Sequence, residues 1–534
     1  MRANDHWCDG AAKSRHVLAT RQRYNEVRFV FYVDSALRRR LMVAIRERKD
    51  CMIYRRTKIV ATLGPASNSP EVLEQLIIAG IDVARLNFSH GTPDEHRARG
   101  QLVRDLAAKH GRHVALLGDL QGPKIRIAKF VNKRIELKVG DPFRLSIAHP
   151  RTEGTEEVVG IDYPGLVTDC RVGDELLLDD GRVVLRVEGM TATELHCTTL
   201  IGGPLSDHKG INRRGGGLTA PALTDKDRDD IKLAASMEVD YLAVSFPRDA
   251  EDMHEARRLM EAAGGKSWLV AKIERAEAVA DDEALDGLIH ASDAVMVARG
   301  DLGVEIGDAE LVGIQKRIIS HARRLNKAVI TATQMMESMI SSPMPTRAEV
   351  SDVANAVLDN TDAVMLSAES AAGQYPVEAV KAMARVCVGA EKQPTSKLSS
   401  HRLGHTFTRW DESIALASIY VANHFPGVKA IISLTDTGYT PLIMSRLRSS
   451  VPIFSFASSR ATQARTALFR NVHTIPFDPT TMPANKVSQA AVDELLKRGI
   501  VEHGDWVILT KGDSYTKRDG TNTMKMYRVG DLLV

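Results

Sequence analysis

What the chain lacks narrows the functions open to it. Of its 534 residues only five are cysteines, and no two of them form a CxxC pair. Scattered cysteines of this kind are typical of reduced thiols, so the sequence predicts neither a disulfide framework nor a zinc site. No apolar run approaches the roughly 18 residues that a membrane-spanning helix requires. We therefore expect a cytoplasmic protein that has no membrane partner.

A strong charge of either sign and a Walker-type phosphate loop are also lacking. The chain has 71 basic and 68 acidic residues, for a formal net charge of +3. So small a net charge gives no broad basic face, and we expect no nucleic-acid partner. The pattern GxxxxGK[ST] does not occur in the sequence, which excludes a P-loop enzyme.

The N-terminal segment, residues 1–54, differs from the rest. It is rich in arginine and has one short apolar patch, Val27–Val33. A secretory signal would place its apolar core nearer the start and end it at a small-residue cleavage site. Acidic residues such as Asp5 and Glu26 count against an organelle transit peptide. We expect a disordered appendage, or an artefact of an early start codon with Met52 as the real beginning.

The remainder alternates apolar strands with amphipathic helices. Eight such units fall within residues 55–121 and 221–393, the number expected for a (β/α)8 barrel, with an open doubly wound sheet as the structural alternative. Residues 122–220 carry short β-type runs and Gly and Asp turns, and predict an inserted all-β lid domain. Residues 394–534 predict a smaller C-terminal α/β domain. The expected barrel strands are Lys58–Leu63, Asp82–Phe88, His113–Leu120, Tyr241–Phe246, Trp268–Ile273, Ala294–Ala298, Ala328–Thr333 and Ala363–Leu366.

Helix signals agree with this alternation. After the first strand, Ser69, Pro70 and Glu71 supply a cap, a first-position proline and a first-turn acid. Gly80 supplies the stop. Further helices are expected at Thr224–Met237, Val312–Leu325 and Arg347–Leu358.

The stretch from Ala294 to Gly307 is unusual because a buried apolar strand ends at once in polar residues. Gly300 lets a backbone approach a ligand closely, and Asp301 is an oxygen ligand suited to a divalent cation. We expect a Gly-punctuated loop here, with chemistry at the carboxyl end of the strand. Taken alone, the stretch also fits an ordinary strand-to-helix turn that carries an exposed Asp.

Polar residues end most of the other predicted barrel strands, often as pairs two apart that share one face. Burying them without partners would cost about 1–3 kcal/mol each, so we expect one polar site at the barrel mouth, with a ligand and ions as partners. Taken alone, Lys272 and Glu274 also fit an intrastrand ion pair. The strand-end residues are Arg85, Asn87, Asp119, Ser245, Lys272, Glu274, Arg299, Asp301, Thr333, Ser367 and Glu369.

Four of these residues suggest a reaction class. Glu274 and Asp301 belong to neighbouring strands, and with substrate oxygens and water they could complete an octahedral magnesium site. Lys272 and Arg85 are fixed cations beside them. Two cations, two carboxylates and no evident nucleophile fit phosphoryl transfer, in which positioning and charge neutralisation do most of the work.

These residues also resemble those of pyruvate kinase, over nearly the whole chain from Thr57. The resemblance implies a barrel, an inserted lid and a C-terminal regulatory domain, in a homotetramer. It implies the last step of glycolysis, in which the phosphoryl group of phosphoenolpyruvate moves to ADP and gives pyruvate and ATP. The matching stretches are Thr57–Pro65, Arg85–Gly91, Gly118–Arg126, Ala271–Glu274, Met296–Gly303 and Thr331–Met339.

The resemblance also implies roles for single residues at the reacting group. Lys272 would stabilise the phosphoryl group in flight and the enolate oxygen, and Arg85 would bind phosphate. Glu274 and Asp301 would hold Mg²⁺, for which Mn²⁺ can substitute.

The substrate and the nucleotide would have binding residues of their own. The backbone at Gly300 and Asp301, with the Thr333 hydroxyl, would receive the substrate carboxylate, since loop amides beside a helix start suit an anion. Thr333 would also lie on the proton path to the enolate carbon, and Ser245 would help to bind substrate. A lid that carries nucleotide-binding residues would exclude water. The nucleotide residues implied are Asn87, His90, Arg126 and Lys209.

One departure from the common family pattern concerns potassium. Many pyruvate kinases bind K⁺ through residues that match Asn87, Ser89, Asp119 and Leu120, and have Glu where this chain has Lys124. Members that need no K⁺ resemble this chain at Leu120 and Lys124. An ammonium group at Lys124 would supply the positive charge that the ion otherwise provides. We therefore expect that K⁺ is not required.

The predicted C-terminal domain carries a hydroxyl-rich turn after a strand, which matches the effector loop of the family. Such a turn can cradle phosphate through backbone amides and hydroxyls, although an ordinary Ser/Thr turn is the alternative. Tyr439 stands where a basic residue is frequent, and the sequence is most similar to members activated by AMP or a sugar monophosphate. The expected effector-loop residues are Thr435, Thr437, Gly438 and Thr440.

Two other functions remain open at this point. One is a magnesium-dependent barrel lyase or aldolase that acts through an enolate, but a lyase has no need of the nucleotide residues Arg126 and Lys209. The other is a catalytically silent barrel, against which the intact Lys272, Glu274 and Asp301 argue.

Overall fold

The computed structural model describes residues 54–393, 406–513 and 520–531. The expectation of a disordered or artefactual N-terminal extension therefore falls outside the described residues, apart from Tyr54.

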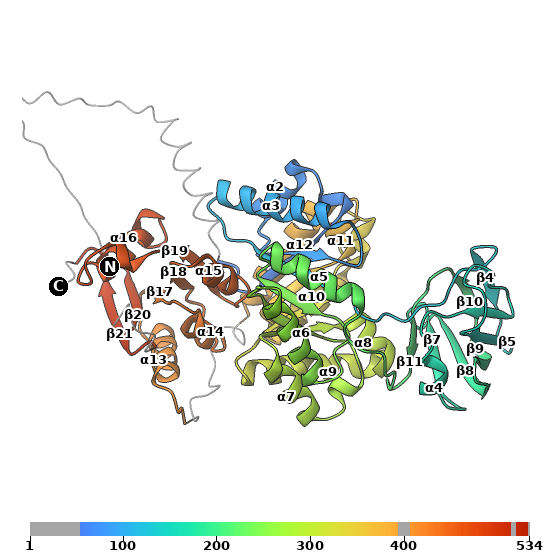
Figure 1. Cartoon of the computed structure of the whole chain (residues 1–534). Coiled ribbons are helices and arrows are strands. Elements are labelled where there is room, and N and C mark those ends of the chain that lie inside the picture. Colours follow the sequence, from blue (N-terminus) through green and yellow to red (C-terminus); the bar gives the residue numbers. More distant parts are fainter. Residues whose placement is uncertain (1–53, 394–405, 514–519, 532–534) are drawn as a thin grey trace, which may run out of the picture. The chain divides into compact units, whose positions relative to one another are not determined.

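The central domain is a closed barrel of eight parallel strands, in the order β1–β16–β15–β14–β13–β12–β3–β2 (Figure 1). The prediction of a (β/α)8 barrel is confirmed, and the open doubly wound sheet is wrong. Adjacent strands pair in parallel register, for example Val83 of β2 with Ala115 of β3. The strands are β1 (Lys58–Leu63), β2 (Val83–Asn87), β3 (Ala115–Asp119), β12 (Tyr241–Val244), β13 (Trp268–Ile273), β14 (Ala294–Ala298), β15 (Ala328–Ala332) and β16 (Ala363–Leu366).

The barrel helices begin where the sequence offers capping groups. Ser69 accepts a hydrogen bond from Val72 N at the start of α2, and Gly80 ends that helix with a φ of 112°. Thr224 and Thr346 form capping boxes at the starts of α5 and α10. The helices are α2 (Pro70–Ala79), α3 (Pro93–Lys109), α5 (Asp225–Ser236), α6 (Ala250–Ala262), α7 (Asp282–Ala291), α8 (Arg299–Ile306), α9 (Asp308–Arg324), α10 (Arg347–Leu358), α11 (Ala368–Ala371) and α12 (Pro376–Glu391).

Helix α8 corrects one prediction. The stretch after β14 was expected to be a loop punctuated by glycines, but it is a helix that begins at Arg299, directly after the strand. Asp301 in its first turn favours the helix start, and Leu302 and Glu305 are buried. Gly307, with a φ of 93°, ends it. The glycine pattern therefore marks the end of a short helix.

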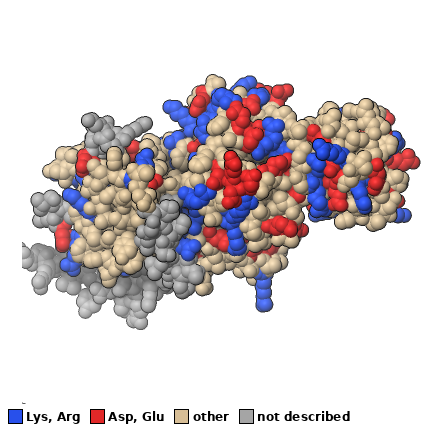
Figure 2. All heavy atoms as spheres, turned by 90° about the horizontal axis from the view of Figure 1, so that it is seen from below, with Lys and Arg blue, Asp and Glu red and all other residues tan. Residues whose placement is uncertain are grey.

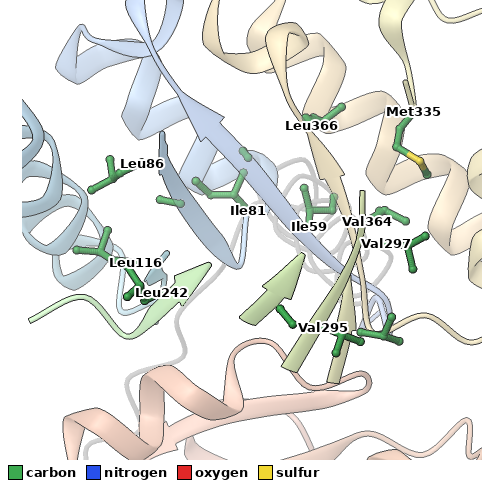
Figure 3. Packing of buried hydrophobic residues seen from close by; sticks show 14 of the residues in the cluster. Ile59, Ile81, Leu86, Leu116, Leu242, Val295, Val297, Met335, Val364 and Leu366 are labelled. Atoms are coloured by element: carbon green, nitrogen blue, oxygen red, sulfur yellow. The ribbon is translucent and has the colours of Figure 1, made fainter. Parts of the chain in front are cut away.

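Side chains alternate along the barrel strands between two hydrophobic cores. In β1, Ile59 belongs to the cluster shared with the surrounding helices, whereas Val60 belongs to the cluster that fills the inside of the barrel and continues into the C-terminal domain. Figure 3 shows Ile59, Val295 and Val364 in the outer cluster. This double burial explains why these strands read as unbroken apolar runs.

An all-β lid domain is inserted between β3 and α5, as predicted. It has a two-stranded sheet and a six-stranded sheet, ordered β11–β7–β8–β9–β5–β6, around a core of its own that includes Phe143 and Leu185. Its one α-helical turn is α4 (Leu166–Asp169). The strands are β4 (Arg134–Leu137), β5 (Pro142–Ser146), β6 (Val158–Gly160), β7 (Glu175–Leu178), β8 (Val183–Met190), β9 (Glu194–Ile201), β10 (Gly203–Ser206) and β11 (Ile211–Arg213).

The C-terminal domain is α/β, as predicted, with a five-stranded sheet ordered β19–β18–β17–β20–β21. Its last strand pairs antiparallel with β20. The sequence pattern located three of these strands and missed β19 and β21. The elements are β17 (Val428–Leu434), β18 (Ile453–Ala457), β19 (Val472–Pro476), β20 (Trp506–Lys511), β21 (Thr523–Arg528), α13 (Trp410–His424), α14 (Tyr439–Ser445), α15 (Arg460–Thr466) and α16 (Val487–Lys497).

A buried ion pair joins the C-terminal domain to the barrel. Arg446, at the end of α14, pairs with Asp362, which precedes β16, and their side chains are 1% and 0% exposed. Arg446 Nη1 also donates to Lys327 O at 2.6 Å. Asp362 in turn accepts a hydrogen bond from Arg470 N at 2.9 Å. Both charges are therefore compensated inside the protein.

The described cysteines are inert. Cys170, Cys197 and Cys387 are free and buried, and burial raises the pKa of each thiol to about 12. Cys8 and Cys51 lie outside the described residues.

The described surface agrees with the small net charge. Figure 2 shows Lys and Arg intermixed with Asp and Glu over the face that it draws. In the described part of the chain, no helix combines the length and apolarity needed to traverse a membrane.

Candidate active site

An ammonium group forms the centre of the barrel mouth. Lys272 Nζ, from β13, lies 2.8 Å from Glu274 Oε1 and 3.5 Å from Asp119 Oδ1. It donates a hydrogen bond to Ser245 Oγ at 2.7 Å. Burial acts against a charge on Lys272, but the carboxylates of Asp119 and Glu274 outweigh it and raise the pKa of the amine. Lys272 is therefore a fixed cation at neutral pH.

A second cation lies on the other side of Asp119. Arg85 Nε, from β2, is 2.5 Å from Asp119 Oδ2, and its Nη1 donates to Thr62 Oγ1 at 2.9 Å. Burial would raise the pKa of Asp119, but Arg85 and then Lys272 lower it. Asp119 was expected among the polar strand ends and in the potassium region, and here it contacts both cations.

Glu274 is one of the two carboxylates predicted to bind magnesium. Only 1% of it is exposed, and its Oε2 accepts a hydrogen bond from Phe246 N at 2.7 Å. Burial, together with the nearby charge of Asp301, raises the pKa of Glu274 to about 7. Glu274 follows β13 and Asp301 follows β14, and these two strands pair side by side in the barrel, so the two carboxylates come from neighbouring strand ends. Lys272 also contacts Ser245 and Asp119, which come from other strand ends, so its pair with Glu274 is only part of its environment.

Asp301 contacts the segment that leads from β3 into the lid. Lys124 Nζ, a few residues after β3, donates to Asp301 Oδ1 at 2.9 Å. Burial acts against the charge on Lys124, but Asp301 outweighs it and raises the pKa of the amine. Lys124 thus places a third positive charge beside the two carboxylates.

The donor set at this mouth fits magnesium. Among the residues described, no three His, Cys, Asp or Glu side chains gather into a protein-only metal cage. Mg²⁺ keeps several waters and is held by one or two carboxylates together with substrate oxygens. Glu274 and Asp301 match that requirement, and when bound the ion would neutralise charge on the phosphoryl group.

Gly300 and Thr333 meet beside Asp301. Gly300 N donates to Thr333 Oγ1 at 2.8 Å, and that hydroxyl donates to Ala332 O at 2.7 Å. A Cβ atom at Gly300 would project toward the Thr333 side chain, 3.7–3.9 Å from its atoms. The glycine therefore leaves the space in front of the hydroxyl open, which suits a small anion against a helix start.

Two strand-end residues do not face the mouth, so the expectation of one shared site is wrong for them. The guanidinium of Arg299 contacts the backbone after β15 and Asp352 of α10. Glu369 accepts hydrogen bonds from Ser367 N at 2.6 Å and Met336 N at 3.2 Å, and burial raises its pKa. Both side chains satisfy backbone groups instead, which their spacing in the sequence could not reveal.

The predicted nucleotide residues lie on two domains. In the lid, Arg126 and Lys209 come from adjacent segments, because Ile127 N donates to Lys209 O at 2.9 Å. Lys209 Nζ is 2.7 Å from Asp179 Oδ1. On the barrel, His90 is exposed after β2. The structure thus places Arg126 and Lys209 on neighbouring segments of the lid.

The residues of the predicted potassium region come from the ends of β2 and β3. Asn87 Oδ1 accepts a hydrogen bond from Ser89 N at 3.1 Å. Leu120 is 1% exposed and offers no side-chain oxygen. Asp119 is already occupied by Arg85 and Lys272. Arg85 and Lys272 at Asp119, together with Lys124 at Asp301, therefore supply positive charge to this region.

The predicted effector loop lines a cavity of about 480 Å³ in the C-terminal domain. Thr435 Oγ1 accepts a hydrogen bond from Gly438 N at 3.0 Å, and Gly438 has a φ of 85°. Tyr439 OH donates to Glu412 Oε1 at 2.9 Å. The Arg409 guanidinium lies over the Tyr439 ring, 4.7 Å from its centroid. Thr435, Thr437 and Thr440 all contribute to the lining.

The sequence analysis missed one buried carboxyl group, that of Glu305, which contacts the last strand of the lid. Glu305 follows Asp301 by one helical turn and is 4% exposed. Its Oε2 accepts from Ala276 N at 2.8 Å and its Oε1 from Asn212 Nδ2 of β11 at 3.3 Å. Burial, with Glu277 nearby, raises its pKa to about 7. The spacing of four residues from Asp301 was the available signal.

Comparisons with known proteins agree with this geometry. Residues 54–380 match the family described as "Pyruvate kinase, barrel domain", and residues 412–527 match "Pyruvate kinase, alpha/beta domain". The chain is 56% identical over 475 residues to pyruvate kinase II of Salmonella typhimurium, covering 89% of this chain and 99% of that protein. It is 55% identical over 458 residues to the pyruvate kinase of Haemophilus influenzae, covering 86% and 96%. Identity to the Geobacillus stearothermophilus enzyme is 43% over 483 residues, covering 90% and 81%.

Proposed function

The chain belongs to the pyruvate kinase family, and from that premise we propose how its own residues carry the reaction. Like the family, it transfers the phosphoryl group of phosphoenolpyruvate to ADP and so forms pyruvate and ATP. The alternative of a magnesium-dependent lyase or aldolase has no support in these relatives. Family membership also implies magnesium as the metal.

Lys272 and Arg85 handle the charge that moves during transfer. An oxygen of the ADP β-phosphate attacks phosphorus, and the bond from phosphorus to the enol oxygen breaks, so its electron pair stays on that oxygen as an enolate. The Lys272 ammonium stabilises both the phosphoryl group and the enolate, while Arg85 binds the phosphoryl oxygens. The observation that carries this assignment is the Lys272 ammonium held between Glu274 and Asp119 at the barrel mouth.

Substrate binding and the final proton are assigned to residues around Asp301. Glu274 and Asp301 are the carboxylates that would hold Mg²⁺. The substrate carboxylate binds at the backbone amides of Gly300 and Asp301 and at the Thr333 hydroxyl. The enolate carbon then takes a proton from water along a path that passes Thr333, which gives pyruvate.

The lid and its neighbours complete the proposal. Arg126 and Lys209, with Asn87 and His90, bind the nucleotide. The lid excludes water, which otherwise competes with ADP for the phosphoryl group. Ser245 supports the substrate indirectly, since it accepts a hydrogen bond from Lys272.

Replacing Lys272 by methionine tests the central assignment. Lys272→Met should reduce kcat by at least about 10²–10³-fold, because it removes a preorganised charge from the transition state. The variant should stay folded and bind Mg²⁺, with a somewhat lower Tm because the buried Asp119 and Glu274 lose a cationic partner. The matched control is Lys266→Met, an exposed lysine just before the same strand, which should keep full activity. A coupled pyruvate assay with and without ADP reads out both variants; near-normal turnover of Lys272→Met would contradict the assignment.

Independence from potassium is a separate proposal, supported by the ion pair of Lys124 with Asp301. An assay with Na⁺ or tetramethylammonium as the only monovalent cation should give the rate found with K⁺. A large drop relative to K⁺ would refute this proposal.

Regulation and assembly are proposed as follows. The cavity lined by Thr435, Thr437 and Thr440, next to Gly438, binds AMP or a sugar monophosphate, and a thermal-shift screen of such effectors tests it. The protein forms a homotetramer, which light scattering of the purified chain can measure. The domain boundaries are those of the sequence analysis: 55–121 with 221–393, 122–220 and 394–534.

A further inference from the structure

Arg299 stands at the head of α8, yet its side chain lies behind the barrel mouth. It is only 7% exposed. Its Nη1 lies 2.8 Å from Asp352 Oδ1 of α10 and 3.4 Å from Gln315 Oε1 of α9. The two helices thus hold one edge of the guanidinium. The other edge faces the turn that follows β15.

That turn has a strained backbone. Thr333 and Gln334 have φ angles of 65° and 52°. These angles lie in the left-handed region, which L residues seldom adopt, and a β-branched residue such as threonine adopts it least readily. Each such residue costs about 1–3 kcal/mol and persists only where its surroundings hold it. A specific group must therefore hold this turn.

Arg299 contacts every carbonyl of the strained turn. Nε lies 3.2 Å from both Ala332 O and Thr333 O, and Nη2 lies 2.7 Å from Thr333 O and 3.2 Å from Gln334 O. Arginine has five N–H donors in a rigid planar fork, which suits three successive carbonyls. An ammonium group has no such shape.

The strained turn also fixes the position of the Thr333 hydroxyl, which is proposed to bind the substrate. Thr333 Oγ1 donates to Ala332 O and accepts from Gly300 N, at 2.7 and 2.8 Å. Gly300 is the residue after Arg299, so one short segment holds the Thr333 backbone with a side chain and its hydroxyl with an amide. If the turn relaxed, the hydroxyl would leave its place.

We propose that Arg299 is a positioning residue of the transfer reaction: its guanidinium, anchored by Asp352, holds the turn from Ala332 to Gln334 so that the Thr333 hydroxyl faces the substrate carboxylate and the enolate carbon. The inference rests on the proposed role of Thr333. It assigns Arg299 no contact with the substrate.

Arg299→Met tests the inference. A misplaced Thr333 should raise the KM for phosphoenolpyruvate about tenfold and lower kcat by about 10–100-fold, since a displacement of about 1 Å can cost 10²-fold. The KM for ADP should stay within about twofold, because the nucleotide residues lie elsewhere, so this split separates positioning from a general loss of folded enzyme. Exchange of the pyruvate methyl protons with D₂O, a direct measure of proton transfer at the enolate carbon, should fall with kcat.

Three further variants control the experiment. Arg258→Met removes an exposed arginine of α6, on another part of the barrel, and should leave all parameters unchanged. Arg299→Lys keeps the charge without the fork and should recover only part of the activity. Asp352→Asn leaves Arg299 in place without its anchor and should shift the KM for phosphoenolpyruvate in the same direction by a smaller factor. This last variant keeps the test valid if Arg299→Met does not fold.

The outcomes separate this inference from the role of Thr333. If Thr333→Ala raises the KM for phosphoenolpyruvate while folded Arg299→Met behaves as wild type, the inference about Arg299 is wrong and the role of Thr333 stands. If both variants behave as wild type, the role of Thr333 itself fails. Full activity of Arg299→Lys would overturn the argument from the planar fork.

Discussion

Glu305 should make the folded protein less stable as the pH rises, and Glu305→Gln should remove that effect. The carboxyl is 4% exposed, and burial raises its pKa from 4.5 to about 7. The folded state therefore keeps the proton at pH values where the unfolded state has lost it. Between these two pKa values the folded state binds more protons, so the free energy of unfolding falls as the pH rises, and above the folded pKa it levels off.

The size of the effect follows from the same values. Each pKa unit corresponds to about 1.4 kcal/mol, so the interval from 4.5 to about 7 corresponds to about 3 kcal/mol of lost stability at alkaline pH. Glutamine keeps the shape of the side chain, and its amide oxygen can still accept from Ala276 N. The variant carries no charge to bury, so its stability should not fall in this window.

Thermal unfolding measures the prediction. The Tm of Glu305→Gln minus the Tm of wild type should increase by several degrees, about 5 °C, between about pH 5 and about pH 8.5. Glu310→Gln, at an exposed position in the first turn of α9, is the matched control and should follow wild type at every pH. A constant difference between Glu305→Gln and wild type across this range would show that the carboxyl titrates normally.

Three further predictions concern other parts of the chain. Arg446→Met leaves the buried Asp362 without its partner and should lower stability by about 3–5 kcal/mol, which calorimetry measures, and adding Asp362→Asn should recover part of the loss. Lys124→Glu removes the side-chain cation at Asp301 and should make turnover depend on K⁺, measured against Na⁺. Gly438→Ala places a Cβ 3.1 Å from Thr466 Cγ2 at a φ of 85° and should weaken activation by a phosphorylated effector while basal turnover stays unchanged.

Most of the barrel could be predicted from the sequence because two-sided burial leaves unbroken apolar runs. The predicted bounds of β1, β13, β14 and β16 agree with the structure. The bounds of α10 were predicted as well, and the structure shows that Thr346 and Glu349 form its capping box. The missed strand β21 has only half-buried or exposed side chains, so it offers no apolar run to recognise.

The candidate site could be predicted in its residue types but not in its directions. Lys272 was expected at the mouth from its place near a strand end, and it lies there. Arg299 has a similar place, but its direction depends on a strained turn and on Asp352, which is 53 residues away along the chain. Contacts over such separations leave no local pattern. Glu305 had a local signal in its spacing from Asp301, but its contact with Asn212 of the lid, 93 residues away along the chain, could not be predicted.

The inert thiols have a practical consequence for following the lid in solution. Cys170, Cys197 and Cys387 are buried with pKa values of about 12, so a maleimide dye would not label them, because only an accessible thiolate reacts. Once Cys8 and Cys51 are changed to serine, one cysteine introduced on the exposed surface of the lid and one on the barrel would be the sole attachment points. Fluorescence energy transfer between the two dyes would then test whether the inserted domain closes over the barrel during turnover.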